Sequence, residues 1–149
     1  MSTRSATIIR QVDIWPSSTG PDSEERNELL RFYRHCDGYP DGHGLEMAKT
    51  LQLMTSAYRT DWAAQLISYM ALTGCIEIEG RRVEHGDLEY LYVVDGVADH
   101  RAGVSSRGAQ ITLSVYRIGW DEPYQECMKK APYFTGTPDE YVERFGKEQ

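Results

Sequence analysis

Residues 32–44 of the chain are FYRHCDGYPDGHG, and the rest of the sequence is arranged around them. The dipeptide Asp-Gly occurs at 37–38 and again at 41–42. It favours turns, because aspartate hydrogen-bonds its own backbone and glycine permits positive φ angles. Pro40 restricts the residue before it to an extended conformation. The segment is therefore predicted to be a double turn that ends at Gly44, where a helical pattern begins.

Three hypotheses account for this segment. In the first it is structural: Asp37 caps the loop, the tyrosines pack in the core, and His35 is a buried imidazole with satisfied hydrogen bonds. In the second it binds a ligand, so that backbone amides at the helix N-terminus and an arginine meet an anion while a tyrosine stacks on a ring. In the third, His35, Asp37 and His43 form a catalytic or metal site, with His35 as the general base.

The third hypothesis has the least support from the sequence. No serine or cysteine is paired with an evident base, and no further metal ligands lie at a diagnostic spacing. Walker, Rossmann and zinc-protease signatures are missing, so no cofactor, metal or catalytic residue is predicted. The candidate ligand-binding residues are Arg4, Tyr33, Arg34, His35, Asp37, Gly38, Tyr39, Gly42, His43 and Gly44.

Two parts of the chain carry a resemblance to known proteins. They are Thr3-Arg4-Ser5 and the pattern Tyr33-x-His35-x-Asp37-Gly38-Tyr39-Pro40-x-Gly42-x-Gly44. Over residues 1–12 and 30–55 the chain resembles a group of small uncharacterised phage and prophage proteins. Cys36 stands where that group has tryptophan, and the segment before the motif is longer here. The resemblance implies no activity; it implies an accessory gene of a mobile element, expressed against host defences.

Length and composition place the chain among soluble proteins. With 149 residues, 40% hydrophobic and 26% charged, residues 1–149 are expected to form a single domain. An apolar run of membrane length and a signal-peptide pattern are both missing, so a cytoplasmic location is expected, in the host cell if the chain is phage-encoded. Cys36, Cys75 and Cys127 are widely spaced and are predicted to be free thiols.

The charge is acidic and uneven. A formal net charge of −7 argues against direct nucleic-acid binding through a broad basic face. Residues 74–100 hold seven acidic and two basic side chains, and such a face can mimic phosphates toward the basic groove of a partner. A merely solvated surface is the alternative. The candidate protein-interface residues are Glu77, Glu79, Glu89, Tyr90 and Tyr92, since tyrosine adds contact area at low entropic cost.

Periodicity predicts the elements. Apolar alternation predicts strands near residues 6–14, 29–35, 75–79, 87–94 and 110–118. Helical spacing and capping signals predict helices near residues 47–58, 60–73, 124–130 and 137–145. Residues 22–25 are expected to start a short helix, a helix over 23–33 is the alternative to the second strand, and residues 80–86 are expected to be a hairpin connection.

These elements predict an α+β domain, an antiparallel sheet of about four or five strands with helices packed on one face. The other face, bearing tyrosines and charged residues, is expected to be free for a partner. The leading functional hypothesis is a non-enzymatic binding protein that inhibits a host defence protein or complex, such as a CRISPR effector. A nucleotide-scale ligand binder and a hydrolase or nuclease are the alternatives. A homodimer through the free sheet face or edge is a further expectation.

Overall fold

The computed structural model describes residues 3–54, 62–73, 76–80, 83–101 and 110–147. The elements in these ranges are β1 (Ser5–Trp15), β2 (Ser23–Arg34), the π-helical turn η1 (Pro40–Gly44), α1 (Leu45–Met54), α2 (Trp62–Thr73), β3 (Ile76–Glu79), β4 (Tyr90–Asp99), β5 (Gln110–Arg117), α3 (Tyr124–Cys127), β6 (Phe134–Gly136) and α4 (Pro138–Phe145). The fold is α+β, which confirms the predicted class.

The strands form one six-stranded sheet in the order β3-β2-β1-β4-β5-β6. Neighbouring strands are antiparallel except β1 and β4, which run parallel. The expectation of about four or five antiparallel strands is therefore wrong in number and in one pairing. At three residues, β6 is too short to show an alternating pattern, and alternation does not reveal the direction of a neighbouring strand.

Strand β3 lies at the edge of the sheet beside β2 and not beside β4. The segment between Glu79 and Tyr90 is therefore not the predicted hairpin connection, because it leads from the edge of the sheet to its middle. Pairing partners of short strands are decided by packing across the whole domain, which local sequence does not encode.

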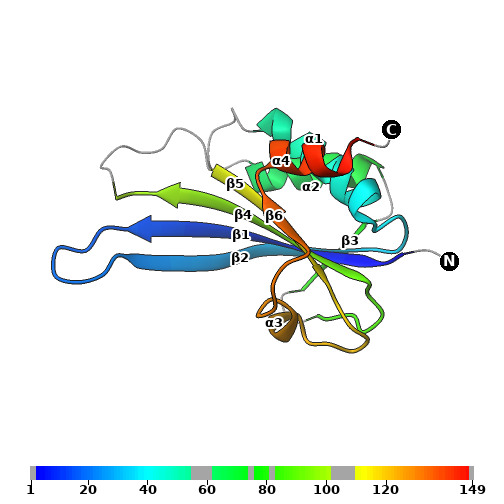
Figure 1. Cartoon of the computed structure of the whole chain (residues 1–149), viewed down its shortest axis with the longest axis horizontal. Coiled ribbons are helices and arrows are strands. Elements are labelled where there is room, and N and C mark those ends of the chain that lie inside the picture. Colours follow the sequence, from blue (N-terminus) through cyan, green and yellow to red (C-terminus); the bar gives the residue numbers. More distant parts are fainter. Residues whose placement is uncertain (1–2, 55–61, 74–75, 81–82, 102–109, 148–149) are drawn as a thin grey trace.

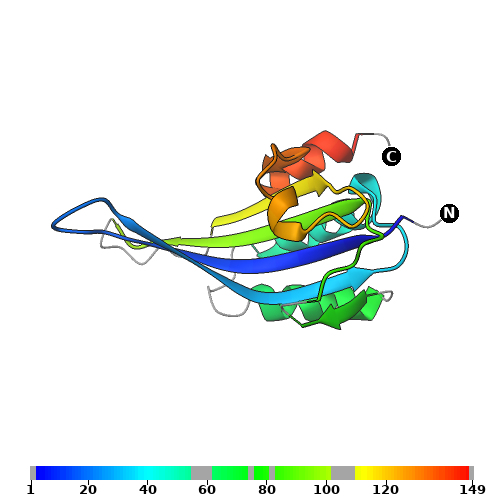
Figure 2. The same cartoon turned by 90° about the horizontal axis from the view of Figure 1, so that it is seen from below.

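Strand β2 is continuous over 12 residues. The short helix predicted at 22–25 and the alternative helix over 23–33 are both wrong. β2 pairs with β1 along its whole length, and this pairing outweighs the preference of its acidic residues for a helix start. The outer half of the β1–β2 hairpin extends past the helices (Figures 1 and 2), and there β2 is exposed to solvent.

Helices α1, α2 and α4 cover one face of the sheet, and α3 lies on the other (Figure 1). The larger core lies under the three helices, where Tyr92 and Val94 of β4 are completely buried. Helices on one face were predicted, but the tyrosine-bearing face of β4 was expected to be free and is the covered one. A smaller core on the opposite face joins Ile8 and Leu91 to Cys127 of α3.

The helix ends that lie inside the described ranges are close to their predicted positions. The capping box of α4 is confirmed: Thr137 Oγ1 accepts from the Glu140 amide at 3.2 Å, and the Glu140 carboxylate accepts from the Thr137 amide at 3.0 Å. The predicted end of the first helix and the start of the second fall in residues 55–61, outside the described residues. In the described ranges, no helix has the length and apolar character needed to span a bilayer.

Two of the three cysteines, Cys36 and Cys127, lie in the described ranges. No disulfide joins Cys36 and Cys127, and Cys75 lies outside the described residues. Burial raises the pKa of the Cys127 thiol to about 11, so this side chain stays protonated and unreactive at neutral pH.

Candidate functional site

The backbone amides of Gly38, Gly42, His43 and Gly44 donate hydrogen bonds inside the fold. The Gly38 amide donates to the Thr3 carbonyl at 3.0 Å. The amides of Gly42 and Gly44 donate to the Tyr39 carbonyl at 3.0 and 3.2 Å. Because these donors have partners, the glycine amides are not free to form the predicted phosphate cradle.

The glycines serve close packing more than turn geometry. The positive φ angle falls on Asp37, at 55°, a value that aspartate tolerates. A Cβ atom on Gly38 would lie 2.8 Å from Ser5 Oγ. A Cβ atom on Gly44 would overlap the hydroxyl of Tyr141 and lie 2.8 Å from Tyr92 Cε1. The loop therefore needs glycine where it presses against β1, β4 and α4.

Two buried tyrosine hydroxyls donate hydrogen bonds to carbonyl groups of the loop. Tyr92 of β4 donates to the Gly38 carbonyl at 2.7 Å, and Tyr141 of α4 donates to the Pro40 carbonyl at 2.7 Å. Burial raises the pKa of both tyrosines well above the usual range, so both hydroxyl groups remain protonated donors. The bond between Tyr141 and Pro40 joins residues that are about a hundred positions apart in the sequence.

His43 is completely buried between the sheet and the loop. Arg34 Nη1 lies 3.3 Å from His43 Nδ1, and Thr7 Oγ1 lies 3.4 Å from His43 Nε2. A guanidinium only donates, so Nδ1 is the acceptor and the proton of the neutral ring resides on Nε2. Burial, with a smaller contribution from Arg34, lowers the pKa of His43 to about 3. His43 is therefore a neutral structural group.

The proposed catalytic residues do not meet. His35 contacts the ring of Tyr33, at 4.5 Å between centroids, on the α3 side of the sheet. His43 contacts the ring of Phe32, at 5.7 Å, on the helix-covered side. Consecutive residues of β2 point to opposite faces, so the sheet separates the two imidazoles. The His43 amide donates to the Asp37 carbonyl at 2.9 Å, but the His43 ring does not meet the His35 ring, so the predicted acid–base arrangement is not formed.

The arginines offered for anion binding also have partners. Arg4 pairs with Asp87 at 2.6 Å. Arg34 is buried and donates to the Cys36 carbonyl at 2.7 Å, with Glu46 at 3.4 Å. Among the described residues, no group of three or more histidine, cysteine, aspartate or glutamate side chains is placed to hold a metal ion.

The predicted interface residues do not form one surface. Glu77 pairs with His35 at 2.8 Å and Glu79 pairs with His85 at 2.9 Å, both on the edge strand β3. Tyr90 begins β4, which is separated from β3 by two strands, Glu89 comes just before it, and Tyr92 is completely buried. Tyr92 therefore cannot belong to an exposed interface, and the acidic residues are divided between separate places.

A hollow beside the loop is the best candidate site. Its volume is about 470 Å³, and loop, sheet and C-terminal helix all contribute to its wall. The lining residues are Tyr39, Pro40, Asp41, Tyr90, Tyr133, Arg144, Phe145 and Lys147. We refer to these residues as the aromatic hollow, because four of the eight are tyrosine or phenylalanine.

The aromatic hollow is cationic on an acidic chain. Arg144 and Lys147 are exposed, and no described carboxylate forms an ion pair with either of them. Arg117 places its guanidinium 4.7 Å from the centre of the Tyr133 ring, which adds a third cation at the margin. Asp41 is the one carboxylate in the lining. An anionic group next to an aromatic ring is the chemistry that this arrangement favours.

The sequence indicated only part of this site. Tyr39 and Tyr90 were candidates, whereas Tyr133, Phe145 and the two cations of α4 were not. They reach the loop because α4 packs on α1 and because the backbone amide of Tyr133 donates to Val115 at 2.7 Å. No local signal near residue 133 points to the motif about ninety residues earlier.

In comparisons with known proteins, no family model matches the chain, and no curated protein or solved structure matches it. The chemistry of the site therefore rests on the geometry described above.

Gly44→Ala is expected to lower the free energy of unfolding by about 1–3 kcal/mol, because the new methyl group overlaps Tyr141 and crowds Tyr92. Urea unfolding followed by circular dichroism measures the change. Gly119→Ala is the control, since its Cβ would lie 3.8 Å from Glu122 Oε1 and meets only ordinary contact. Equal stability of the two variants would contradict the packing role of Gly44.

The stability of the protein is expected to fall as the pH drops below about 6.5. The pKa of His43 is about 6.5 in the unfolded chain and about 3 in the folded chain. Between these two pH values the unfolded chain therefore binds a proton that the folded chain does not. This group alone contributes a loss of about 1.4 kcal/mol per pH unit. Unfolding measured from pH 7 to pH 4 should show a steeper slope for the wild type and His35→Gln than for His43→Gln. Equal slopes for all three proteins would count against a buried neutral His43.

Proposed function

We propose that this chain acts by binding a partner protein at the aromatic hollow, without catalysing a reaction. The observation that supports this most is the combination, in one concave place, of exposed rings and cations that form no ion pair with a described carboxylate. Tyr39 and Tyr133 are each 39% exposed, and Arg144 lies at the same rim. Tyrosine, phenylalanine and arginine are the residue types enriched at the energetic centres of protein interfaces.

A non-catalytic role is supported by what the reactive side chains do in the fold. His43 is buried and neutral, His35 is paired with Glu77, and the Cys127 thiol is held protonated by burial. These contacts assign the side chains most suited to chemistry to structural tasks. None of the described residues that line the hollow is histidine, cysteine or serine.

The charge of the aromatic hollow suggests what the partner brings. Among the described residues, the lining holds two cations that form no ion pair and one carboxylate, which favours a partner segment that carries an acidic side chain next to an apolar or aromatic one. The resemblance to phage and prophage proteins would make that partner a host protein or complex, with a defence complex as the leading proposal and the host cytoplasm as the location. This setting is carried by the resemblance alone.

A nucleotide-scale ligand is a second candidate for the same place. About 470 Å³ is within the volume range of small-molecule sites, and the lining offers rings for stacking and two cations for a phosphate group. The ligand would then meet the outer side chains of Tyr39 and Asp41 in the aromatic hollow and not the glycine amides, which already have partners.

Site-specific photo-crosslinking tests the proposal. A benzophenone amino acid replaces Tyr133 at the hollow or, as a control, Trp120, which is 78% exposed and does not line the hollow. In the cells that naturally make the protein, irradiation is expected to give a discrete protein adduct from position 133 and none from position 120.

Adding Arg144→Glu and Lys147→Glu to the position-133 protein is expected to reduce the adduct at least about tenfold, because charge repulsion replaces attraction. Equal adducts from positions 133 and 120, or no adduct from either, would contradict a protein partner at the hollow. Native mass spectrometry that instead finds a nucleotide-sized mass, lost in the same double variant, would favour the second candidate.

A further inference from the structure

Helix α2 presents an uncharged surface to solvent. None of its 12 residues is aspartate, glutamate, lysine or arginine. Its inner side is buried through Trp62, Leu66 and Met70. Its outer side carries Leu72, 87% exposed, and Tyr69, 47% exposed. A helix with apolar residues on both sides is expected to be covered on both sides, yet the described part of the chain covers only one.

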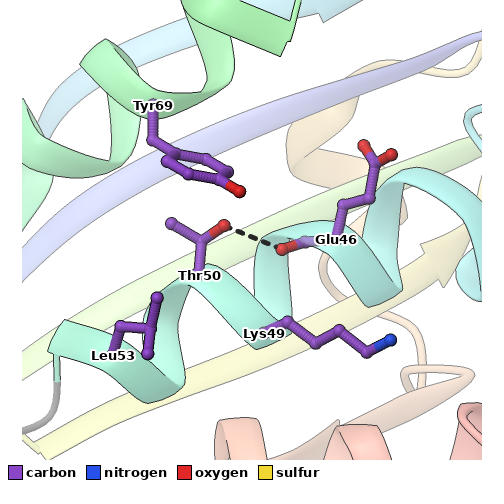
Figure 3. Close-up of a pocket in the computed structure, with 5 residues that line it drawn as sticks. All are labelled: Glu46, Lys49, Thr50, Leu53 and Tyr69. Carbon is purple, nitrogen blue, oxygen red and sulfur yellow. Dashed lines mark hydrogen bonds between the residues drawn. The ribbon is translucent and has the colours of Figure 1, made fainter.

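The outer side of α2 is hollowed next to its protruding residues. A hollow of about 560 Å³ is lined by Met54, Ala64, Gln65, Ser68, Tyr69 and Leu72. A smaller one, of about 170 Å³, lies between α1 and α2 and is lined by Glu46, Lys49, Thr50, Leu53 and Tyr69 (Figure 3). Tyr69 reaches from α2 over Thr50 of α1 and separates the two. Leu53, 76% exposed, protrudes from the neighbouring helix.

We propose that a second copy of this chain covers this surface, with α2 of one protomer against α2 of its partner. In a two-fold dimer the same patch meets itself, so it must hold both the protruding group and the space that receives it. The α2 surface meets this requirement, because Leu72 stands at the rim of the 560 Å³ hollow. Ala64 and Ser68 are small and let the two helices approach closely.

The charges at this surface are compatible with a second copy. Each protomer carries a formal net charge of −7, so two copies repel each other wherever acidic surfaces meet. An α2–α2 contact brings together helices without charge, and among the residues that line the two hollows only Glu46 and Lys49 are charged, with opposite signs. Burial of Leu72 and Tyr69 therefore stabilises the dimer without a like-charge penalty.

This dimer is independent of the proposed binding function. The aromatic hollow is lined by residues of the loop, β4, the segment before β6 and the end of α4, and none of them belongs to α2. A dimer through α2 also differs from the dimer through a sheet face or edge that the sequence suggested.

Sedimentation velocity across a wide range of protein concentrations tests the proposal. The wild type is expected to sediment as a dimer that dissociates on dilution. Leu72→Glu is expected to raise the dimer dissociation constant more than about tenfold, because each protomer loses a buried leucine and gains a facing charge. Trp120→Glu, which changes another exposed apolar side chain, is the matched control and should remain a dimer. Circular dichroism verifies that both variants are folded.

A cysteine cross-link locates the contact. Ser68 lies near the middle of α2, so in a two-fold α2–α2 contact it approaches its own copy. Ser68→Cys is expected to give a disulfide-linked dimer on mild oxidation, whereas Gln125→Cys on the exposed side of α3 should not. A wild type that stays monomeric at the highest concentration, or a dimer that Leu72→Glu leaves unchanged, would overturn the proposal.

Discussion

Two hydrogen bonds from buried tyrosines hold this fold together at one point. Tyr92 and Tyr141 donate to the carbonyls of Gly38 and Pro40, and they thereby tie β4 and α4 to the segment that leads into α1. A satisfied hydrogen bond contributes about 1 kcal/mol, but a buried hydroxyl left without its acceptor costs about 1–3 kcal/mol. The loop must therefore keep its path. Its glycines follow from this constraint, because a side chain at Gly44 would occupy the space of the tyrosine hydroxyl.

The same constraint determines where a ligand can meet the chain. The loop turns its carbonyl groups inward to the tyrosines, and the side chains of Tyr39 and Asp41 outward to the aromatic hollow. One short segment is thus scaffold on its inner side and the wall of a site on its outer side. The motif is informative about function because it positions that wall beside the end of α4, although most of its own reactive groups are engaged in the fold.

Local patterns in the sequence predicted the local features and missed the long-range ones. Alternation located β1, β4 and β5, and the capping box at Thr137 located α4, because each signal lies within a few residues. The parallel pairing of β1 with β4, and the separation of His35 from His43 by the sheet, depend on which strands become neighbours. The aromatic hollow was missed for the same reason, since Tyr133 and Lys147 come near Tyr39 only through the pairing of Tyr133 with β5 and the packing of α4.

Amide hydrogen exchange tests most directly whether the 37–44 loop is part of the cooperative core. The Gly38 amide donates to the Thr3 carbonyl, and the His43 amide donates to the Asp37 carbonyl. Because the buried hydroxyls of Tyr92 and Tyr141 also bond to this loop, both amides should exchange only when the whole domain unfolds. The account predicts that their exchange free energies equal that of Val94 in the centre of the sheet and fall equally in urea. Exchange of Gly38 and His43 through a local opening that is insensitive to urea, with Val94 still protected, would contradict it. The loop would then be a mobile segment free to close on a ligand.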